Sequence, residues 1–426
     1  MRSPTRRTAL AVCIALLLVT AGCSGGTGPS STATSSDAAT TGAATTTTAD
    51  DAPAPEPEVP ASSTGVDTGN GTWSPNVGVE EYPPGVAENG TLANVSALLD
   101  AHFAATANAS VVFTYGMTGP NQTVSRTYGH GADGRPFYSS RDENTSDGGR
   151  VVEETYWNGS RGYSRVYAST RPELGTVHRG FQNVTYLLET YKPGGEAFGR
   201  RTDLGTPLHL GNYSVNGTVE RGDRTLVELT ADDASGDAAD SMTDFDGRVL
   251  VTPDGVVYEA TSSTTQSADD GTEERYAWNV SLQTGVEWTG PPAWMDDIPQ
   301  LSVSIVEDGR AVELRNTGGA ALPANTSLDI FARNDPLHGE VRSGEPRNAR
   351  SGLRPPERAA TVTTDVRLEP GEAVYVTAGA DGNASSFALH DEPTSGEYTF
   401  GFAGVRSTDG DVGYYLGTGI VSWNTE

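Results

Sequence analysis

The residues with the clearest chemistry lie near the N-terminus, where an apolar run ends at a cysteine. Residues 16–26 read LLLVTAGCSGG. Small side chains at Ala21 and Gly22 admit a peptidase, and the thiolate of Cys23 is nucleophilic enough to accept a thioether-linked lipid. The chain has two cysteines, and the other, Cys13, lies inside the apolar run. We therefore expect cleavage before Cys23 and lipidation of its thiol.

The segment before Cys23 is typical of an export signal. Arg6 and Arg7 precede an apolar stretch, residues 9–19, that is too short to cross a bilayer, which takes about 20 residues. The pair of arginines resembles a twin-arginine export signal. Residues 20–23 resemble a lipoprotein lipobox, with Thr20 where leucine is usual. We expect a signal peptide over residues 1–22 and a protein anchored to the outer face of the cytoplasmic membrane, with the membrane as its partner. The alternative is a simple secreted protein.

The sequence shows no other arrangement of residues that is typical of a catalytic or metal-binding site. Without Cys13 the mature chain has no thiol except Cys23, which excludes disulfides, cysteine-ligated metals and cysteine nucleophiles. No G-x-S-x-G motif places a serine nucleophile. The six histidines are scattered without an i, i+4 pair: His102, His130, His178, His209, His338 and His390. We expect no enzyme, no catalytic residue, no metal site and no cofactor.

Two further stretches resemble ligand motifs without their context. Residues 129–134, GHGADG, match G-x-G-x-x-G but lead into another strand pattern, so no helix N-terminus is present to hold a pyrophosphate. We expect a glycine-rich hairpin loop there. Residues 230–247 are rich in aspartate, but their spacing does not follow the EF-hand pattern. That segment is expected to be an acidic surface loop.

The charge excludes one class of partner. The chain has 56 acidic and 28 basic residues and a formal net charge of −28. Such a surface repels nucleic-acid phosphates, so we expect no nucleic-acid partner. In high salt the Debye length shrinks to about 3 Å, and the self-repulsion is screened. Richness in arginine, threonine, alanine, glycine and aspartate, with Lys192 as the single lysine, resembles haloarchaeal proteins.

Asn-x-Ser/Thr sequons are dense in the chain. Their density fits a glycosylated surface protein. Asn158 lies at an expected hairpin tip, where it is most accessible. The candidate sites in the folded part are Asn89, Asn94, Asn108, Asn121, Asn144, Asn158, Asn183, Asn212, Asn216, Asn279, Asn325 and Asn383, and Asn70 precedes it.

The elements that carry these residues begin after a tether. Residues 23–70 are rich in threonine, serine, alanine, glycine and proline and cannot bury a core, so we expect a disordered tether. Its hydroxyl clusters either carry O-linked sugars or serve as a plain spacer.

A first folded domain is expected over residues 71–299. Residues 91–106 have the apolar spacing of a helix capped by Thr91, and residues 181–191 have the pattern of a second. Between and after them run about ten short strands, with hairpin turns at Asn158-Gly159 and Asp254-Gly255. This order predicts an antiparallel meander whose apolar face is covered by the helices.

Aromatic residues are spread over many of these strands. Alternation sends some of them inward, where they either line a ligand cavity or fill an ordinary core. They are Tyr115, Tyr128, Phe137, Tyr138, Tyr156, Trp157, Tyr163, Tyr167, Tyr258, Tyr276, Trp278 and Trp288.

A second folded domain is expected over residues 300–426. About seven short strands without helical periodicity predict a small β-sandwich. The stretch VELRNTGGAAL resembles immunoglobulin-like modules, although their disulfide is missing. A long loop, residues 333–358, is locally basic, and either contacts a glycan or partner or forms surface salt bridges.

The layout of the first domain resembles a known family. A helix, a long meander and an inserted second helix behind a lipobox are similar to LolA/LppX-type lipoprotein carriers. The stretches YPPGV and WNVSLQTGVEWTGPPAW are similar to haloarchaeal lipoproteins of unassigned function. The resemblance covers roughly residues 80 to 298. It implies a mainly β fold with a curved half-barrel sheet closed by helices around an apolar cavity for acyl chains.

We therefore expect a lipid-anchored surface protein that binds a hydrophobic ligand or lipid in its half-barrel. The alternative is a structural or adhesive glycosylated envelope protein with no small-molecule ligand. The sequence leaves the oligomeric state open.

Overall fold

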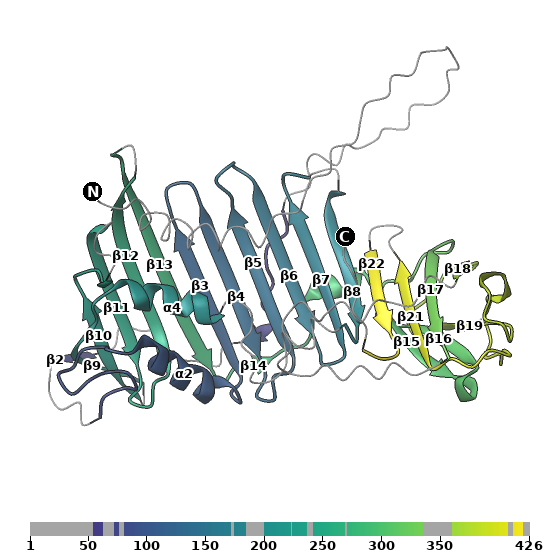
Figure 1. Cartoon of the computed structure of the whole chain (residues 1–426), viewed down its shortest axis with the longest axis horizontal. Helices are drawn as coiled ribbons and strands as arrows, with labels where there is room; N and C mark the ends of the chain where they lie inside the picture. The colour runs from purple at the N-terminus through teal and green to yellow at the C-terminus, as the bar shows by residue number, and fades with distance from the viewer. Residues whose placement is uncertain are drawn as a thin grey trace, which may run out of the picture. The chain divides into compact units, whose positions relative to one another are not determined.

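The computed structural model describes residues 54–62, 72–75, 81–171, 174–184, 200–222, 224–236, 242–268, 271–334, 360–407 and 412–420. The signal peptide, Cys23, most of the tether, Asn70, His338 and nearly all of the basic loop lie outside these residues. Within them the fold is mainly β, with one large curved sheet that does not close (Figure 1). This confirms the predicted fold class.

The large sheet contains two consecutive antiparallel meanders. The first holds β3 (Val111–Thr118), β4 (Thr123–His130), β5 (Phe137–Asn144), β6 (Arg150–Trp157), β7 (Arg161–Ala168) and β8 (Thr176–Gln182). The second holds β9 (Ser214–Arg221), β10 (Arg224–Ala231), β11 (Met242–Val251), β12 (Val257–Ser267) and β13 (Glu273–Thr284), with β2 (Thr72–Pro75) beside β9. Strand β13 pairs with β3 and joins the two meanders into one sheet.

The expected hairpins form, but two of their turns differ from the expected type. The β6–β7 turn has a positive φ of 124° at Gly159 and not at Asn158. The β11–β12 turn has a positive φ of 95° at Gly255 and not at Asp254. Both loops are longer than the two-residue turn that requires positive φ at both positions. Residues 131–136 connect β4 and β5, so the glycine-rich stretch forms the predicted hairpin loop except at Gly129 and His130, which end β4.

The first helix, α2 (Val95–Thr106), begins later than expected. Asn94, and not Thr91, is its N-cap, because the Asn94 side chain accepts a hydrogen bond from the backbone N–H of Ala97. Thr91 instead makes an isolated bridge to Ser214. Leu99, which belongs to the expected apolar face of this helix, is buried in the core.

The second expected helix, residues 181–191, is contradicted at its start and otherwise untested, and α4 (Arg200–Leu210) is a helix that the sequence did not predict. Phe181, the expected start of that helix, lies in strand β8, and residues 185–191 are outside the described part. Helix α4 contains Gly205 and Pro207 and buries Leu204 and Leu208. Of the helices described, none has the length and hydropathy needed to cross a bilayer.

The acidic segment at residues 230–247 is not a single surface loop. Its first residues complete β10, and residues 242–247 begin β11, where Phe245 is buried in the core. Strand alternation explains the difference, because aspartates at Asp244 and Asp246 flank a buried aromatic residue.

The C-terminal part forms the expected β-sandwich. One sheet holds β15 (Pro299–Val306), β16 (Ala311–Gly319), β19 (Ala373–Thr377) and β20 (Ala388–His390). The other holds β17 (Ser327–Arg333), β18 (Ala360–Thr363), β21 (Phe402–Ser407) and β22 (Val412–Gly417), and short turns of 3-10 helix lie at η6 (Glu307–Gly309) and η8 (Ala384–Ser386). Leu314, Ile330 and Val405 are among the residues of the shared core.

One sandwich sheet continues directly into the large sheet. Strand β22 pairs with β8 in parallel, with Tyr414 opposite Gly180. The sixteen strands therefore form one hydrogen-bonded sheet that runs from β2 to β18. We call the β8–β22 pairing the seam.

Residues 54–62, within the predicted tether, lie against the sheet, and we call them the strap. Strand β1 (Ala61–Ser62) pairs with β14 (Glu287–Trp288). The backbone N–H of Glu58 donates to Glu154 at 2.8 Å, and Arg165 donates to the carbonyl of Glu56 at 2.8 Å. At the other end of Glu58, its carboxylate accepts a hydrogen bond at 3.1 Å from the backbone N–H of Ala293, the first residue of a short 3-10 helix, η5 (Ala293–Asp297).

Candidate ligand-binding site

The expected aromatic residues divide evenly between the two faces of the large sheet. Helices α2 and α4 pack on one face, the helix face, and the strap lies on the opposite face, the strap face (Figure 1). The pairs Phe137–Trp157 and Tyr138–Tyr156 lie on opposite faces because strand residues alternate. The helix face holds Tyr115, Tyr128, Phe137, Trp157, Tyr276 and Trp278, and the strap face holds Tyr138, Tyr156, Tyr163, Tyr167, Tyr258 and Trp288.

Beneath the helices the side chains form a packed core. Leu98 and Leu204 from the helices and Phe113 and Val280 from the strands are at most 2% exposed and belong to one cluster. Two cavities lined by described residues lie elsewhere. The described side chains under α2 and α4 pack against one another, as in an ordinary core.

A buried polar cluster ties α4 to this core. Asp203 accepts a hydrogen bond from Arg126 at 2.7 Å and one from the Tyr128 hydroxyl at 3.3 Å. Burial raises the pKa of Asp203 to about 6, although Arg126 opposes the shift. Burial, and then the charge of Arg200, lower the pKa of His102 to about 4. A neutral His102 accepts a hydrogen bond from the backbone N–H of Val257 at 3.1 Å, so this buried histidine has a partner in the core.

The larger cavity lies beside the seam and has a volume of about 480 Å³. It is bounded by β8, β22, the start of β15 and the loop between β16 and β17. This volume falls within the range of about 300–1,000 Å³ that is typical of small-molecule sites. Its apolar lining includes Ile298, Pro299, Ala320, Ala321, Leu322 and Val412, and its polar lining includes His178, Asp297, Asn325, Thr326 and Tyr414.

We call this space the junction cavity, and each strand of the seam contributes a contact that holds its walls. The Tyr414 hydroxyl donates to the carbonyl of Pro299 at 2.9 Å. The ring of His178 lies 6.0 Å from that of Trp294 in η5. Among the described residues of the lining, Asp297 is the one carboxylate. The arrangement can bury an apolar molecule and hydrogen-bond to a single polar group on it.

The sequence-predicted residues converge on this cavity only in part. Of the histidines, His178 lines it, whereas His390 contacts Thr377 in the sandwich. Of the sequons, Asn325 lies in its lining. Within the described residues no group of three or more His, Cys, Asp or Glu side chains could hold a metal ion. The cavity itself was not predicted, because its walls meet only through the pairing of β8 with β22.

The sequons are nearly all accessible. Every candidate in the folded part is exposed except Asn183, which is half-buried. The Asn183 amide also donates to the carbonyl of Gly417 at 2.8 Å. Asn158 is exposed at the β6–β7 hairpin tip, as expected. Asn183 is therefore the candidate least suited to carry a glycan.

Comparisons with known proteins give no family. No family model and no curated protein matches the chain. Among solved structures, the chain is similar to MucB in complex with MucA(peri), with a TM-score of 0.18, 13% identity and coverage of 66% of this chain and 87% of that chain. It is also similar to the MucA/MucB complex of Pseudomonas aeruginosa, with a TM-score of 0.18, 14% identity and the same coverages. At such TM-scores the likeness carries no argument about function.

Proposed function

We propose that this protein is a non-enzymatic surface protein, anchored through a lipid on Cys23, that binds a small and mainly apolar ligand in the junction cavity. The observation that supports the ligand is the cavity itself, with its volume of about 480 Å³ and its largely apolar walls. The ligand is neutral, because Asp297 repels an anionic head group. The proposed site therefore lies at the β8 edge of the half-barrel.

A titration with decanol and decanoate tests this proposal. We expect saturable binding of decanol, measured by tryptophan fluorescence and native mass spectrometry, with weaker binding of decanoate. The Ala321→Trp variant fills the cavity and should weaken decanol binding at least tenfold. Ala388→Trp, at an exposed position of β20, is the matched control. Unchanged binding in Ala321→Trp, or no binding by the native chain, would contradict the proposal.

The anchor has a separate test. Replacing Cys23 by serine removes the thiol that accepts the lipid, so the protein should move from the membrane fraction to the medium. Retention of Cys23→Ser at the membrane would show that the apolar segment itself is the anchor.

A second candidate function is a structural or adhesive glycosylated envelope protein. The packed core under α2 and α4 and the exposure of the sequons favour it. Mass spectrometry of glycopeptides from the native protein tests it. We expect glycans at Asn158 and at the other exposed sequons, and none at Asn183. An unmodified Asn158 would remove the support that glycosylation gives to this candidate.

A further inference from the structure

A second, smaller cavity lies at the end of the β9–β10 hairpin. The tight turn at Gly222, with φ of 58°, places Arg221 and Arg224 directly opposite each other. Like charges in that position destabilise a strand pair, so two arginines there are unexpected on grounds of stability alone. They are more unexpected in a chain with twice as many acidic as basic residues.

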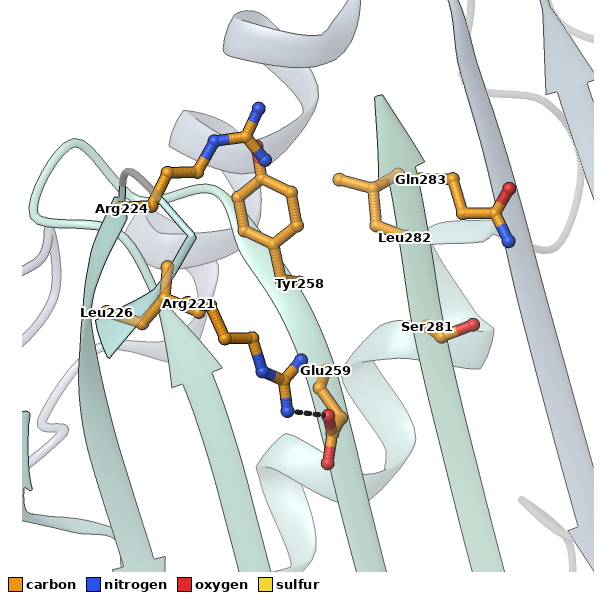
Figure 2. Close-up of a pocket in the computed structure, with 8 residues that line it drawn as sticks. All are labelled: Arg221, Arg224, Leu226, Tyr258, Glu259, Ser281, Leu282 and Gln283. Carbon is orange, nitrogen blue, oxygen red and sulfur yellow. Dashed lines mark hydrogen bonds and ion pairs between the residues drawn. The ribbon is translucent and has the colours of Figure 1, made fainter. Parts of the chain in front are cut away.

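A bulge in β12 turns an aromatic ring and a carboxylate toward these arginines. Leu250 pairs with Glu259 and Val251 with Val257, which leaves Tyr258 as the extra residue. Tyr258 and Glu259 therefore lie on the same side of the sheet, and both line the cavity (Figure 2). Bulges of this kind often re-aim side chains beside binding sites.

The two arginines are held in different ways. The Arg221 guanidinium donates to Glu259 at 2.6 Å, and Figure 2 shows it turned toward that carboxylate. Its Nε is buried, and no hydrogen-bond partner for it lies among the described residues. Arg224 lies 4.9 Å from the centre of the Tyr258 ring, with a long contact of 3.4 Å to Thr284.

Among the described residues, the charged network around this cavity has more arginines than carboxylates. Arg248 shares Glu259 with Arg221 and also binds Glu228, so the two carboxylates of this network are already matched by two arginines. Arg224 is the third arginine, and a guanidinium stacked on an aromatic ring keeps its edge N–H groups available.

We propose that this cavity binds an oxyanion group, a carboxylate or a sulfate, with Arg224 and the Nε of Arg221 as donors. Its volume of about 50 Å³ takes the charged group and leaves the remainder of a larger molecule in solvent. Ser281 and Gln283 border the same space. Arginine donors favour such groups because their N–H geometry matches two oxygens. The sources are free inorganic anions and acidic saccharides.

Selective 15N-arginine labelling of the full mature chain tests this site. Sodium sulfate, sodium glucuronate and glucose are titrated at constant ionic strength, and the Nε–Hε signals of Arg221 and Arg224 are followed by NMR. Sulfate or glucuronate should shift both signals saturably, and glucose should not. Tighter binding of glucuronate identifies the acidic saccharide as the source, and tighter binding of sulfate identifies the free anion.

Two substitutions separate the site from general charge effects. Arg224→Gln should weaken binding at least tenfold, and Arg224→Lys, which keeps the charge but loses the two-pronged donor, should weaken it less. Arg367→Gln removes an exposed arginine of the sandwich and should bind as the native chain does. Native-like binding in Arg224→Gln, or the absence of saturable shifts with both anions, overturns the proposal.

Discussion

Gly180 shows how single residues hold the two parts of the large sheet together. A Cβ atom at this position would lie 2.9 Å from a ring atom of Tyr414 and 3.4 Å from one of Tyr163. The missing side chain thus lets a tyrosine from β7 and one from β22 meet across β8. Burial raises the pKa of both tyrosines, which therefore stay neutral.

We expect Gly180→Ala to lower the free energy of unfolding by about 1–3 kcal/mol, because the added methyl group must displace the buried ring of Tyr414. Gly413→Ala is the matched control, since its Cβ would meet its nearest neighbour at 3.6 Å, an ordinary contact. Chemical denaturation of both variants measures the difference. Equal stabilities would mean that the ring yields without cost.

Asp203 and His102 give opposite dependences of stability on pH. The folded state holds a proton on Asp203 up to about pH 6, so this residue lowers stability as the pH rises from about 4 to 6. The folded state keeps His102 neutral above about pH 4, so His102 raises stability over nearly the same window. In the native protein the changes of stability with pH from these two residues therefore offset each other.

The Asp203→Asn variant should therefore show the dependence of stability on pH that His102 alone contributes. Its melting temperature should rise more steeply than that of the native protein between about pH 4 and 6.5, because only the falling contribution is removed. Thermal unfolding at half-unit pH steps measures this. Parallel pH profiles for the two proteins would show that Asp203 does not titrate in this window.

At the scale of elements, the strap depends on a buried ion pair. Glu154 is fully buried and pairs with Arg165, which is itself 10% exposed. Both residues also bind the strap backbone, Glu154 at Glu58 and Arg165 at Glu56. The pair and the strap therefore shield each other from water.

Arg165→Gln should destabilise the protein by about 3–5 kcal/mol, because it leaves the Glu154 carboxylate buried without its counter-ion. Hydrogen exchange should increase in residues 54–62 before it does in the core. The exposed pair Arg367–Glu369 gives the control, since Arg367→Gln should cost at most about 1 kcal/mol. Unchanged hydrogen exchange in residues 54–62 of this variant would show that the strap binds the sheet without the help of the ion pair.

Elements with local signals could be predicted from the sequence, and those set by distant contacts could not. The hairpins at Gly159 and Gly255 follow from turn residues, and α2 from its apolar spacing. Helix α4 was missed because Gly205 and Pro207 lower its helix propensity, and packing of Leu204 and Leu208 overrides that cost. The junction cavity could not be predicted, since it depends on the pairing of His178 with Val412.

At the scale of the whole molecule, the net charge determines how much salt the folded protein needs for stability. Several buried carboxylates are paired with arginines, such as Asp203 with Arg126 and Glu228 with Arg248. The net charge of −28 nevertheless leaves a large excess of acidic groups that repel one another. Only dissolved salt screens that repulsion.

Dilution from molar to millimolar potassium chloride should thus lower the melting temperature by several degrees. Sucrose at matched osmolality should restore it only in part, because a neutral solute stabilises by exclusion from the protein surface and screens no charge. Differential scanning calorimetry in the three buffers measures this. A melting temperature independent of salt would show that surface repulsion is unimportant for stability.

The strap also determines how the molecule would respond to tension. A pull applied between a membrane-held N-terminus and the folded body acts first on residues 54–62, whose few hydrogen bonds peel one after another. Fully extended at about 3.3 Å per residue, the released segment is about 30 Å long. Force spectroscopy with Cys23 and the C-terminus as handles should record this early low-force step, and Arg165→Gln should abolish it. The strap would then detach at low force, before the sheet unfolds.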